Sequence, residues 1–348
     1  MTQVTGKSSS LRVVAFEVTR RCRFNCRHCR ANAGLDNNHP ELTTEQCKRI
    51  LASIAGFGRC IVILTGGEPM ERSDIYELIR HAGQLGLKAC AATCGYSINH
   101  DSIDKLKQAG VSALSFSLDG SGAATHDKFR GTDGAFDLTI KAAQITRQAG
   151  IRFQINTTIT KINFEQVPAI AQLAKDIGAD YFNPFILVPT GRGRQLAEQT
   201  LEPVEYEKLL NELLRLKQQA RIGVRVTCGP QFARVCGAAG IKGHSDAPGC
   251  LGGREFAFIS CRGDVQTCGF LDISAGNLVE NDFDFAKIWQ NSEFLKRIRN
   301  VSNYKGKCRD CEYLAVCRGC RARAYALNGD YLSSDAICNY QPEYRIIR

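Results

Sequence analysis

The chain has 348 residues, of which 44% are hydrophobic and 23% are charged, and its formal net charge is +10. That balance is typical of a globular protein with one large domain or two moderate ones, and it excludes a disordered or fibrous chain. No apolar run approaches the roughly 18–20 residues that span a bilayer, and the N-terminus lacks the apolar core of a secretory signal. We therefore expect a cytoplasmic protein with no membrane partner. No basic block interleaved with aromatic residues indicates a nucleic-acid partner.

Short β-branched runs alternate with helical patterns over the first two thirds of the chain. The expected strands lie near residues 11–18, 60–64, 87–92, 112–118, 151–159 and 180–188. The expected helices cover residues 73–84, 100–109, 136–149, 165–178 and 203–219, after a first helix capped by Thr43, and several end at a glycine: Gly83, Gly110, Gly150 and Gly178. Six successive strand–helix units predict an α/β fold, a parallel sheet or partial barrel. Its functional residues should lie at the C-terminal ends of the strands.

Seventeen cysteines are the most unusual feature of the composition. Their number is odd and no secretory signal is present, so closely spaced thiols are expected to hold metal rather than to form disulfides. Ten of them follow residue 225, in a region with few long apolar faces whose fold we expect to depend on metal. The sequence thus predicts a polar tail over residues 1–10, a barrel over 11–225 and a small Cys-rich domain over 226–348.

The first group of cysteines follows the first strand directly and consists of Cys22, Cys26 and Cys29. Three thiolates on one loop can ligate three irons of an iron–sulfur cube and leave the fourth iron open to an amine and a carboxylate. The alternative is a zinc site in which His28 supplies the fourth ligand.

The second strand ends in the sequence Gly66-Gly67-Glu68-Pro69. Two glycines allow the backbone to approach a ligand closely, and an exposed backbone edge there can pair with an amino-acid group. Alone this motif is a weak signal, but at the next strand end after a three-cysteine loop it is strong.

These two motifs resemble those of the radical S-adenosylmethionine (radical SAM) superfamily. The resemblance implies a partial (β/α)6 barrel and a [4Fe–4S] cluster with an open iron that chelates the methionine part of S-adenosylmethionine. The backbone of Gly66 to Pro69 would contact the amino group of that cofactor. A low-potential electron donor such as ferredoxin or flavodoxin would reduce the cluster. Cleavage of the sulfonium would then give a 5′-deoxyadenosyl radical that abstracts a hydrogen atom from the substrate.

Later strand ends add candidates for cofactor binding. By resemblance, Ser117 would contact the ribose, Arg130 the carboxylate, and Asn156 the cofactor from the fifth strand, although each is equally typical of an ordinary polar residue at a barrel mouth. Cys47, Cys60 and Cys90 are expected as small buried apolar residues, and Cys94 is left undecided. No catalytic residue is assigned.

The C-terminal cysteines resemble the SPASM extension, which holds auxiliary iron–sulfur clusters. The seven that match are Cys250, Cys268, Cys308, Cys311, Cys317, Cys320 and Cys338. By analogy one complete [4Fe–4S] cluster would be held by Cys308, Cys311, Cys317 and Cys338. A second would be held by Cys250, Cys268 and Cys320 and lacks an obvious fourth ligand. His244, Cys261, Cys236, the substrate or nothing at all would fill that position, so one or two auxiliary clusters are expected.

The stretch from Gly319 to Tyr325 and the short N-terminal lead resemble the tetrapyrrole branch of the superfamily, and in it the haem synthases of the sirohaem-dependent pathway. That resemblance implies a tetrapyrrole substrate, iron-coproporphyrin III, whose two propionates become vinyl groups to give protohaem. An auxiliary cluster would accept the released electron. A didecarboxysirohaem deacetylase or a haem d1 maturase shares these motifs. A SPASM-type peptide maturase often carries a leader-binding module, for which ten residues are too few. A non-enzymatic electron carrier or zinc ribbon gives no reason for the Gly66–Pro69 motif.

Four arginines are candidates for binding propionates, because a guanidinium binds a carboxylate with two parallel hydrogen bonds. They are Arg192 and Arg194 after the sixth strand, and Arg321 and Arg323 beside the last cysteines. The alternative is that all four are solvated surface residues.

Overall fold

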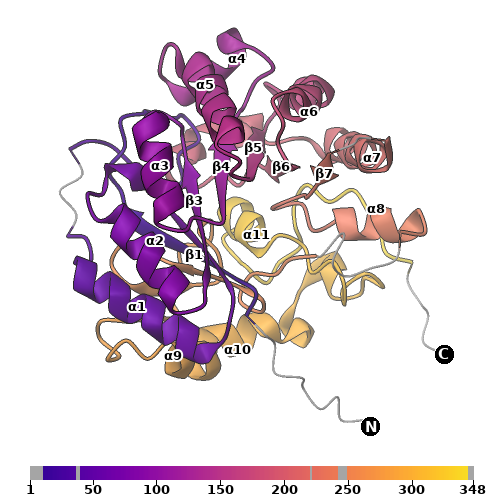
Figure 1. The fold of residues 1–348 in the computed structure, drawn as a ribbon. Coiled ribbons are helices and arrows are strands. Elements are labelled where there is room, and N and C mark those ends of the chain that lie inside the picture. The colour runs from indigo at the N-terminus through magenta and orange to yellow at the C-terminus, as the bar shows by residue number, and fades with distance from the viewer. Residues whose placement is uncertain (1–10, 37–39, 220–221, 242–248, 344–348) are drawn as a thin grey trace.

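A computed structural model describes residues 11–36, 40–219, 222–241 and 249–343. Its centre is a ten-stranded sheet in the order β10-β9-β8-β1-β2-β3-β4-β5-β6-β7 (Figure 1). The strands are β1 Val13–Thr19, β2 Ile61–Gly66, β3 Lys88–Thr93, β4 Ala113–Ser117, β5 Phe153–Ile159, β6 Tyr181–Ile186, β7 Gly223–Val224, β8 Phe256–Ile259, β9 Asp264–Gln266 and β10 Gly276–Asn277. Strands β1 to β6 are neighbours in chain order and all parallel, as the six expected units require.

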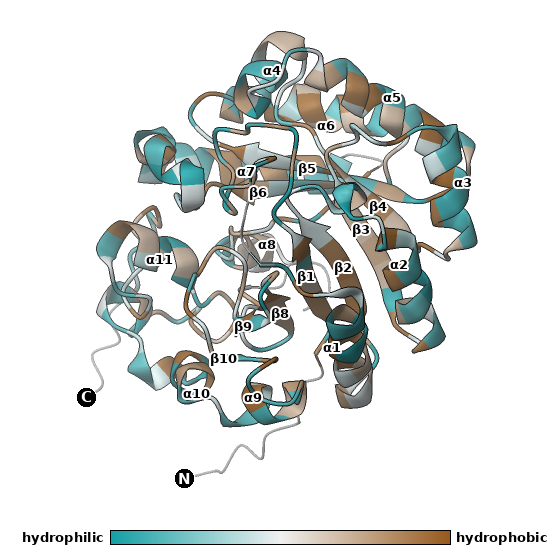
Figure 2. Cartoon of the chain, turned by 90° about the vertical axis from the view of Figure 1, so that its left-hand side faces the viewer, coloured by the Kyte–Doolittle hydropathy of each residue, from teal (hydrophilic) through white to brown (hydrophobic). Residues whose placement is uncertain are grey.

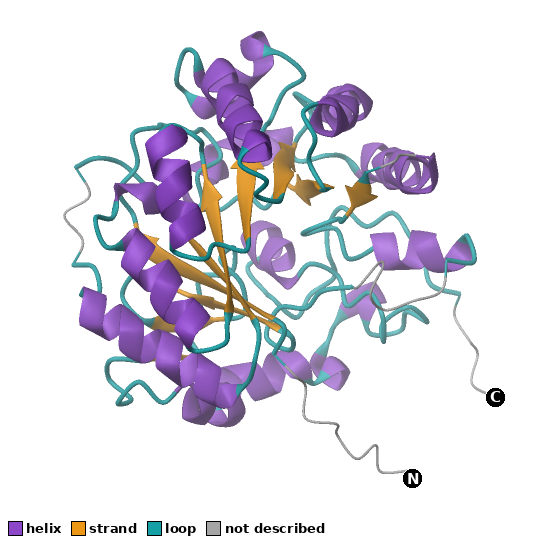
Figure 3. Ribbon diagram, in the orientation of Figure 1, coloured by secondary structure: helices purple, strands orange, loops and turns teal. Residues whose placement is uncertain are grey.

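The described helices are α1 Thr44–Phe57, α2 Ile75–Gln84, α3 His100–Gln108, α4 Ala123–Arg130, α5 Ala135–Gln148, α6 Val167–Asp176, α7 Pro203–Gln219, α8 Phe232–Ala238, α9 Phe285–Asn291, α10 Glu293–Arg299 and α11 Arg321–Asn328. Helices α1 to α7 alternate with strands β1 to β7 and lie along the outer side of the curved sheet, whereas α11 lies on its inner side (Figure 1 and Figure 3). The partial barrel predicted from the strand–helix rhythm is confirmed. Helix α4 and the helices after α7 were not predicted.

Local signals explain where the predicted helices start and end. Thr43 accepts a hydrogen bond from the N–H of Gln46, whose side chain accepts one from the N–H of Thr43, so the expected cap of α1 is a capping box. The prediction that α2 ends at Gly83 is wrong, because Gly83 lies inside the helix. The glycine in the left-handed conformation is Gly86, with φ of +77°, which follows the helix.

The two faces of the barrel sheet differ in polarity. In β5 the residues Phe153, Ile155 and Ile159 are buried in the main hydrophobic core, under the helices. The alternate residues, Gln154 and Asn156 among them, face the other side and are only partly buried. Figure 2 shows mostly brown and pale strands beside helices α1 and α2, whose turns are partly teal. The polar inner face is where a barrel of this kind holds its ligands.

The C-terminal region continues this sheet. Strand β8 pairs in parallel with β1, from Val13 opposite Phe256 onward, and β9 and β10 extend it as antiparallel neighbours. On the outer side α9 packs on α1, with the rings of Phe57 and Phe285 at 5.4 Å. The predicted boundary near residue 225 falls between β7 and α8, but one hydrophobic core crosses it. Among the described helices, none is long and apolar enough to cross a membrane.

Candidate cluster and cofactor sites

The three-cysteine loop lies at the C-terminal end of β1 and is held from a distance. Cys22 and Cys26 are buried, and Cys29 is partly buried in the same small cluster of side chains. Arg192 fixes the loop: its Nε donates to Cys26 O (2.9 Å), its Nη1 donates to Ala33 O (2.6 Å), and its backbone N–H donates to Cys29 O (2.9 Å). The loop is therefore shaped by an arginine that lies beyond the end of the sixth strand, six residues after Ile186.

The Gly66–Pro69 segment packs directly against the chain that leads into this loop. The N–H of Gly67 donates to Thr19 O and that of Glu68 donates to Arg21 O, both at 2.8 Å. A Cβ at Gly66 would lie 2.2 Å from Thr19 O, and one at Gly67 would lie 2.3 Å from Arg21 O. The close approach that the glycines permit is thus to the protein's own backbone, and it sets the spacing between this strand end and the cysteine loop.

Glu68 and Cys94 connect the second and third strand ends. The carboxylate of Glu68 is buried and accepts from the N–H groups of Met70 (3.1 Å) and Cys94 (2.7 Å). The Cys94 thiol is a hydrogen-bonding partner of both Glu68 and Cys22. The hydrogen bond between the two thiols lowers the pKa of Cys22. The same bond raises the pKa of Cys94, and burial raises it further. Cys94, which the sequence left undecided, therefore lies beside the three-cysteine loop.

Three of the polar residues at the strand ends form a row across the inner face of the sheet. Ser117 of β4 lies opposite Asn156 of β5, which lies opposite Asn183 of β6. The amide of Asn156 accepts from Asn183 Nδ2 (3.2 Å) and from Gln154 Nε2 (2.9 Å). Ser117 and Asn156, two of the three residues expected to bind the cofactor from the later strands, are therefore neighbours on adjacent strands.

The third candidate, Arg130, is buried against both the loop and Asp119. Its Nη2 lies 2.6 Å from Asp119 Oδ2, and its Nη1 lies 3.7 Å from Cys26 Sγ. The guanidinium is therefore engaged by an internal carboxylate, while its Nε is buried without a partner. Burial and the cations Arg130 and Arg192 hold the pKa of His28 well below its ordinary value, so this imidazole is neutral.

The zinc alternative finds no support in this arrangement. Within the described ranges, no group of three or more His, Cys, Asp and Glu side chains is arranged to hold a single metal ion. His28 packs on Phe129 with ring centres 4.5 Å apart, and its Nε2 lies 3.8 Å from Asp119 Oδ2, so its ring is engaged by other side chains. Three thiols with a cationic guanidinium beside them fit the thiolate donor set of an iron–sulfur cluster.

The C-terminal cysteines fall into two groups. In the first, the Cys317 thiol is within electrostatic reach of those of Cys308 and Cys338, and Cys311 is within reach of Cys308. In the second, the Cys268 thiol is within reach of Cys250 and Cys320. These are the two sets that the sequence expected. They adjoin, because the N–H of Cys250 donates to Cys317 O (3.1 Å).

The expected alternatives for the missing ligand lie elsewhere or outside the described residues. The Cys261 thiol is buried beside β1 as a hydrogen-bonding partner of Glu17, and Cys236 is buried in α8 within the main core. His244 falls in the segment 242–248, outside the described residues. The sequence reasoning overlooked Cys228, whose thiol is a hydrogen-bonding partner of Cys320. The count of ten cysteines after residue 225 was the one signal for it.

The four candidate arginines have different surroundings, and only Arg194 is exposed. Arg192 holds the cysteine loop, as described above. Arg321 is buried and donates to Tyr331 O (3.1 Å) and Ser333 O (2.6 Å), with its Nη2 3.7 Å from Cys308 Sγ. Arg323 is fully buried, and each of its three nitrogens donates to a protein oxygen. The expectation of solvated surface residues is thus wrong for Arg321 and Arg323, and their donors serve the protein itself.

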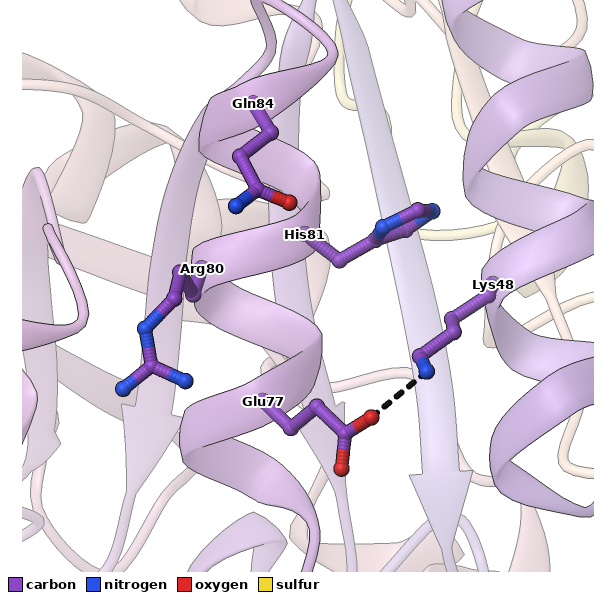
Figure 4. A pocket seen from close by; sticks show the side chains of 5 residues that line it. All are labelled: Lys48, Glu77, Arg80, His81 and Gln84. Carbon is purple, nitrogen blue, oxygen red and sulfur yellow. Dashed lines mark ion pairs between the residues drawn. The ribbon is translucent and has the colours of Figure 1, made fainter.

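A surface hollow lies between α1 and α2, remote from these sites (Figure 4). Lys48 faces Glu77 across it with an ion pair of 2.5 Å, and Arg80, His81 and Gln84 complete the lining. It lies on the helical layer outside the sheet and contains no residue that the sequence singled out.

Comparisons with known proteins agree with the fold. Residues 16–174 match the model of the radical SAM superfamily, and residues 250–321 match that of the SPASM iron–sulfur cluster-binding domain. The chain belongs to the radical SAM superfamily and carries a SPASM domain. It is accordingly a radical SAM enzyme. Its cofactors are a [4Fe–4S] cluster, S-adenosylmethionine and auxiliary iron–sulfur clusters in the SPASM domain.

Within the superfamily, relatives that are about 40% identical to the chain over nearly its full length share one name. It is 40% identical to the AdoMet-dependent heme synthase of Methanosarcina barkeri, covering 95% of this chain and 97% of that one. It is 39% identical to the AdoMet-dependent heme synthase of Oleidesulfovibrio alaskensis, covering 96% and 89%. The Fe-coproporphyrin III synthase of Methanosarcina barkeri is 28% identical, with coverage of 94% and 87%.

Solved structures share the fold at low sequence identity. The crystal structure of Streptococcus suis SuiB bound to precursor peptide SuiA superposes with a TM-score of 0.77 at 20% identity, covering 95% of this chain and 76% of that chain. This likeness extends across the barrel and the C-terminal domain, so their joint architecture is common to both proteins.

Proposed function

We propose that this enzyme converts iron-coproporphyrin III into protohaem by oxidative decarboxylation of two propionates. The observation that carries the proposal is the 40% identity, over almost the whole of both chains, with a protein named AdoMet-dependent heme synthase. Identity falls to 28% for the Fe-coproporphyrin III synthase, which favours haem synthesis over the other tetrapyrrole branches. The tetrapyrrole is the substrate, and a ferredoxin or flavodoxin is the electron donor.

In this proposal the first cluster is held by Cys22, Cys26 and Cys29. S-adenosylmethionine is bound by Gly66 to Pro69, Ser117, Arg130 and Asn156. Support comes from the convergence of these residues at the ends of neighbouring strands, with the Arg130 guanidinium 3.7 Å from the Cys26 sulfur. Together the bound cofactors supply a radical that removes a hydrogen atom from the β-carbon of each propionate.

Each propionate then loses carbon dioxide and one electron as the vinyl group forms, so a centre that accepts an electron is required. The thiols of the SPASM domain lie close to the barrel: Cys320 packs with Val188, which follows β6. An auxiliary cluster at this position is suited to take the electron from the substrate. Arg194, exposed after β6, is the candidate best placed to bind a propionate carboxylate.

The test is anaerobic incubation of the reconstituted enzyme with a strong reductant, S-adenosylmethionine and iron-coproporphyrin III, followed by mass spectrometry. We expect stepwise loss of carbon dioxide and two hydrogens from two propionates. An unchanged tetrapyrrole alongside free 5′-deoxyadenosine would contradict the proposed substrate and leave the radical chemistry intact. Didecarboxysirohaem and then peptides would be assayed next.

A further inference from the structure

Four cysteines, rather than three, converge in the second C-terminal group. Cys228 hydrogen-bonds with Cys320 through its thiol and lies within electrostatic reach of Cys268. Cys268 is in turn within reach of Cys250 and Cys320. Cys228, Cys268 and Cys320 also share one packed cluster with Val188 and Leu271. Cys228 precedes the matched SPASM segment, which begins at residue 250, so its position in the sequence gives no hint of this contact.

A fully buried ion pair holds the backbones of Cys228 and Cys320 together. Arg323 pairs with Asp335 through Nε (2.9 Å) and Nη2 (2.6 Å), and both side chains are wholly excluded from solvent. The remaining nitrogen of Arg323, Nη1, donates to Cys228 O (2.8 Å). Asp335 Oδ2 accepts from the N–H of Cys320 (3.0 Å). One ion pair thus fixes both cysteines at once, at a site where an unmatched charge would be costly.

The conformation of Cys228 is itself constrained. Its φ is +57°, in the left-handed region that residues other than glycine seldom adopt. Just before it, Thr227 is bound to β6, because its N–H donates to Pro184 O (2.9 Å) and its Oγ1 donates to Asn183 Oδ1 (2.8 Å). An unfavourable backbone conformation that is held from both sides is typical of a residue whose side chain must point to one place.

We propose that Cys228 is the fourth ligand of the second auxiliary cluster, together with Cys250, Cys268 and Cys320. The enzyme then has two auxiliary [4Fe–4S] clusters, each with four thiolates. With every iron of this cluster ligated by protein, the tetrapyrrole does not ligate it, and the cluster acts in electron transfer alone. This electron-accepting role rests on the proposed function, whereas the ligand assignment rests only on the arrangement of the thiols.

The first experiment measures metal content in the full chain, reconstituted anaerobically. Wild type should hold about twelve irons and twelve sulfides, as three four-iron clusters require. Cys228→Ala should lose about one to four irons per chain and show the spin-resonance signal of a three-iron cluster when oxidised. The matched control, Cys261→Ala, removes a buried thiol of the same region and should keep the wild-type iron content. An unchanged iron content and spectrum in Cys228→Ala, or loss in Cys261→Ala alone, would overturn the assignment.

A second variant covers the case in which Cys228→Ala does not fold. Cys228→Ser keeps the volume and offers an oxygen ligand, so it should retain four irons at this site with a shifted reduction potential. A potential equal to that of wild type in a spectroscopic redox titration would overturn the proposal. Neither measurement uses a tetrapyrrole. A wild type with about twelve irons that leaves iron-coproporphyrin III unchanged therefore contradicts the function and not the ligand set.

Discussion

The two thiol-bearing regions bring their sulfur atoms together in opposite ways. At the barrel mouth, three cysteines within eight residues share one loop, and the rest of the fold only shapes that loop. In the SPASM domain, four thiols of one group come from segments that start at Cys228 and end at Cys320. Each region contains a buried Arg–Asp pair. Arg130 turns a nitrogen toward the sulfur of Cys26, whereas Arg323 binds the backbone of Cys228. The pair at the barrel mouth thus places a positive charge beside a thiol, and the pair in the SPASM domain fixes the positions of two cysteines.

The largest effect is expected in the barrel loop. Cys29→Ala removes one of three thiolates from a cluster that has no protein ligand to spare, so formation of 5′-deoxyadenosine should fall to background. The control variant Cys90→Ala, which changes a thiol within β3, should form 5′-deoxyadenosine as the wild type does. The measurement is chromatography of the nucleoside after anaerobic reaction. Substantial cleavage by Cys29→Ala would mean that the loop is not the site of the radical chemistry.

The next largest effect is a loss of stability when the buried ion pair of the SPASM domain is broken. Asp335→Asn leaves Arg323 buried without its counter-charge and should lower the free energy of unfolding by about 3–5 kcal/mol. Anaerobic chemical denaturation of both proteins measures this difference. A loss below about 1 kcal/mol would contradict the positioning role of the pair.

The same pair predicts a pH dependence with a definite sign. Burial alone would raise the pKa of Asp335, but Arg323 and the hydrogen bonds from Gln231 and Cys320 hold the pKa below the ordinary value of 3.8. The stabilisation is therefore complete above about pH 4 and is lost as the pH falls through the lowered pKa. Asp335→Asn should lack this component, so unfolding curves of the two proteins should converge in acid.

Variants of two nearby arginines, Arg192 and Arg194, distinguish support of the cysteine loop from binding of the substrate. Arg192→Ala removes two charged hydrogen bonds to loop carbonyls, and we expect the first cluster to be lost to a chelator about tenfold faster or more. Arg194→Ala, two residues away and exposed, should leave that rate unchanged and instead raise KM for iron-coproporphyrin III. Absorbance decay and steady-state kinetics measure the two effects. Equal rates of cluster loss in Arg192→Ala and wild type would contradict the support role.

The smallest effects concern two glycines of the barrel. Gly67→Ala places a Cβ against Arg21 O and should destabilise by about 1–3 kcal/mol. Gly83→Ala lies inside α2 with open space at the new Cβ, and should stabilise by about 0.5–1 kcal/mol. Thermal unfolding distinguishes them by sign. A neutral Gly67→Ala would show that the strand end and the cysteine loop are less closely coupled than their contact indicates.

The features that could be predicted from the sequence are those determined by residues close together in the chain. The six strands, the capping box at Thr43 and the three-cysteine loop each depend on residues within one segment, and the family resemblance adds to them. Helix α4 was missed because it is short and its N-cap, Gly122, makes no side-chain hydrogen bond. Cys228 was missed for a different reason. Its contact with Cys320 exists only after β6, β7 and α11 are in place, and no spacing rule connects the two residues.

The pairing of β1 with β8 has a consequence for how the chain folds as it is made. Strand β8 is synthesised roughly 240 residues after β1, so the outer edge of β1 has no partner until almost three quarters of the chain is complete. An apolar strand with a bare edge is a template for wrong pairing with another chain. Nascent chains and versions truncated before residue 256 should therefore aggregate, and the SPASM domain protects the barrel from self-association as well as carrying its metal.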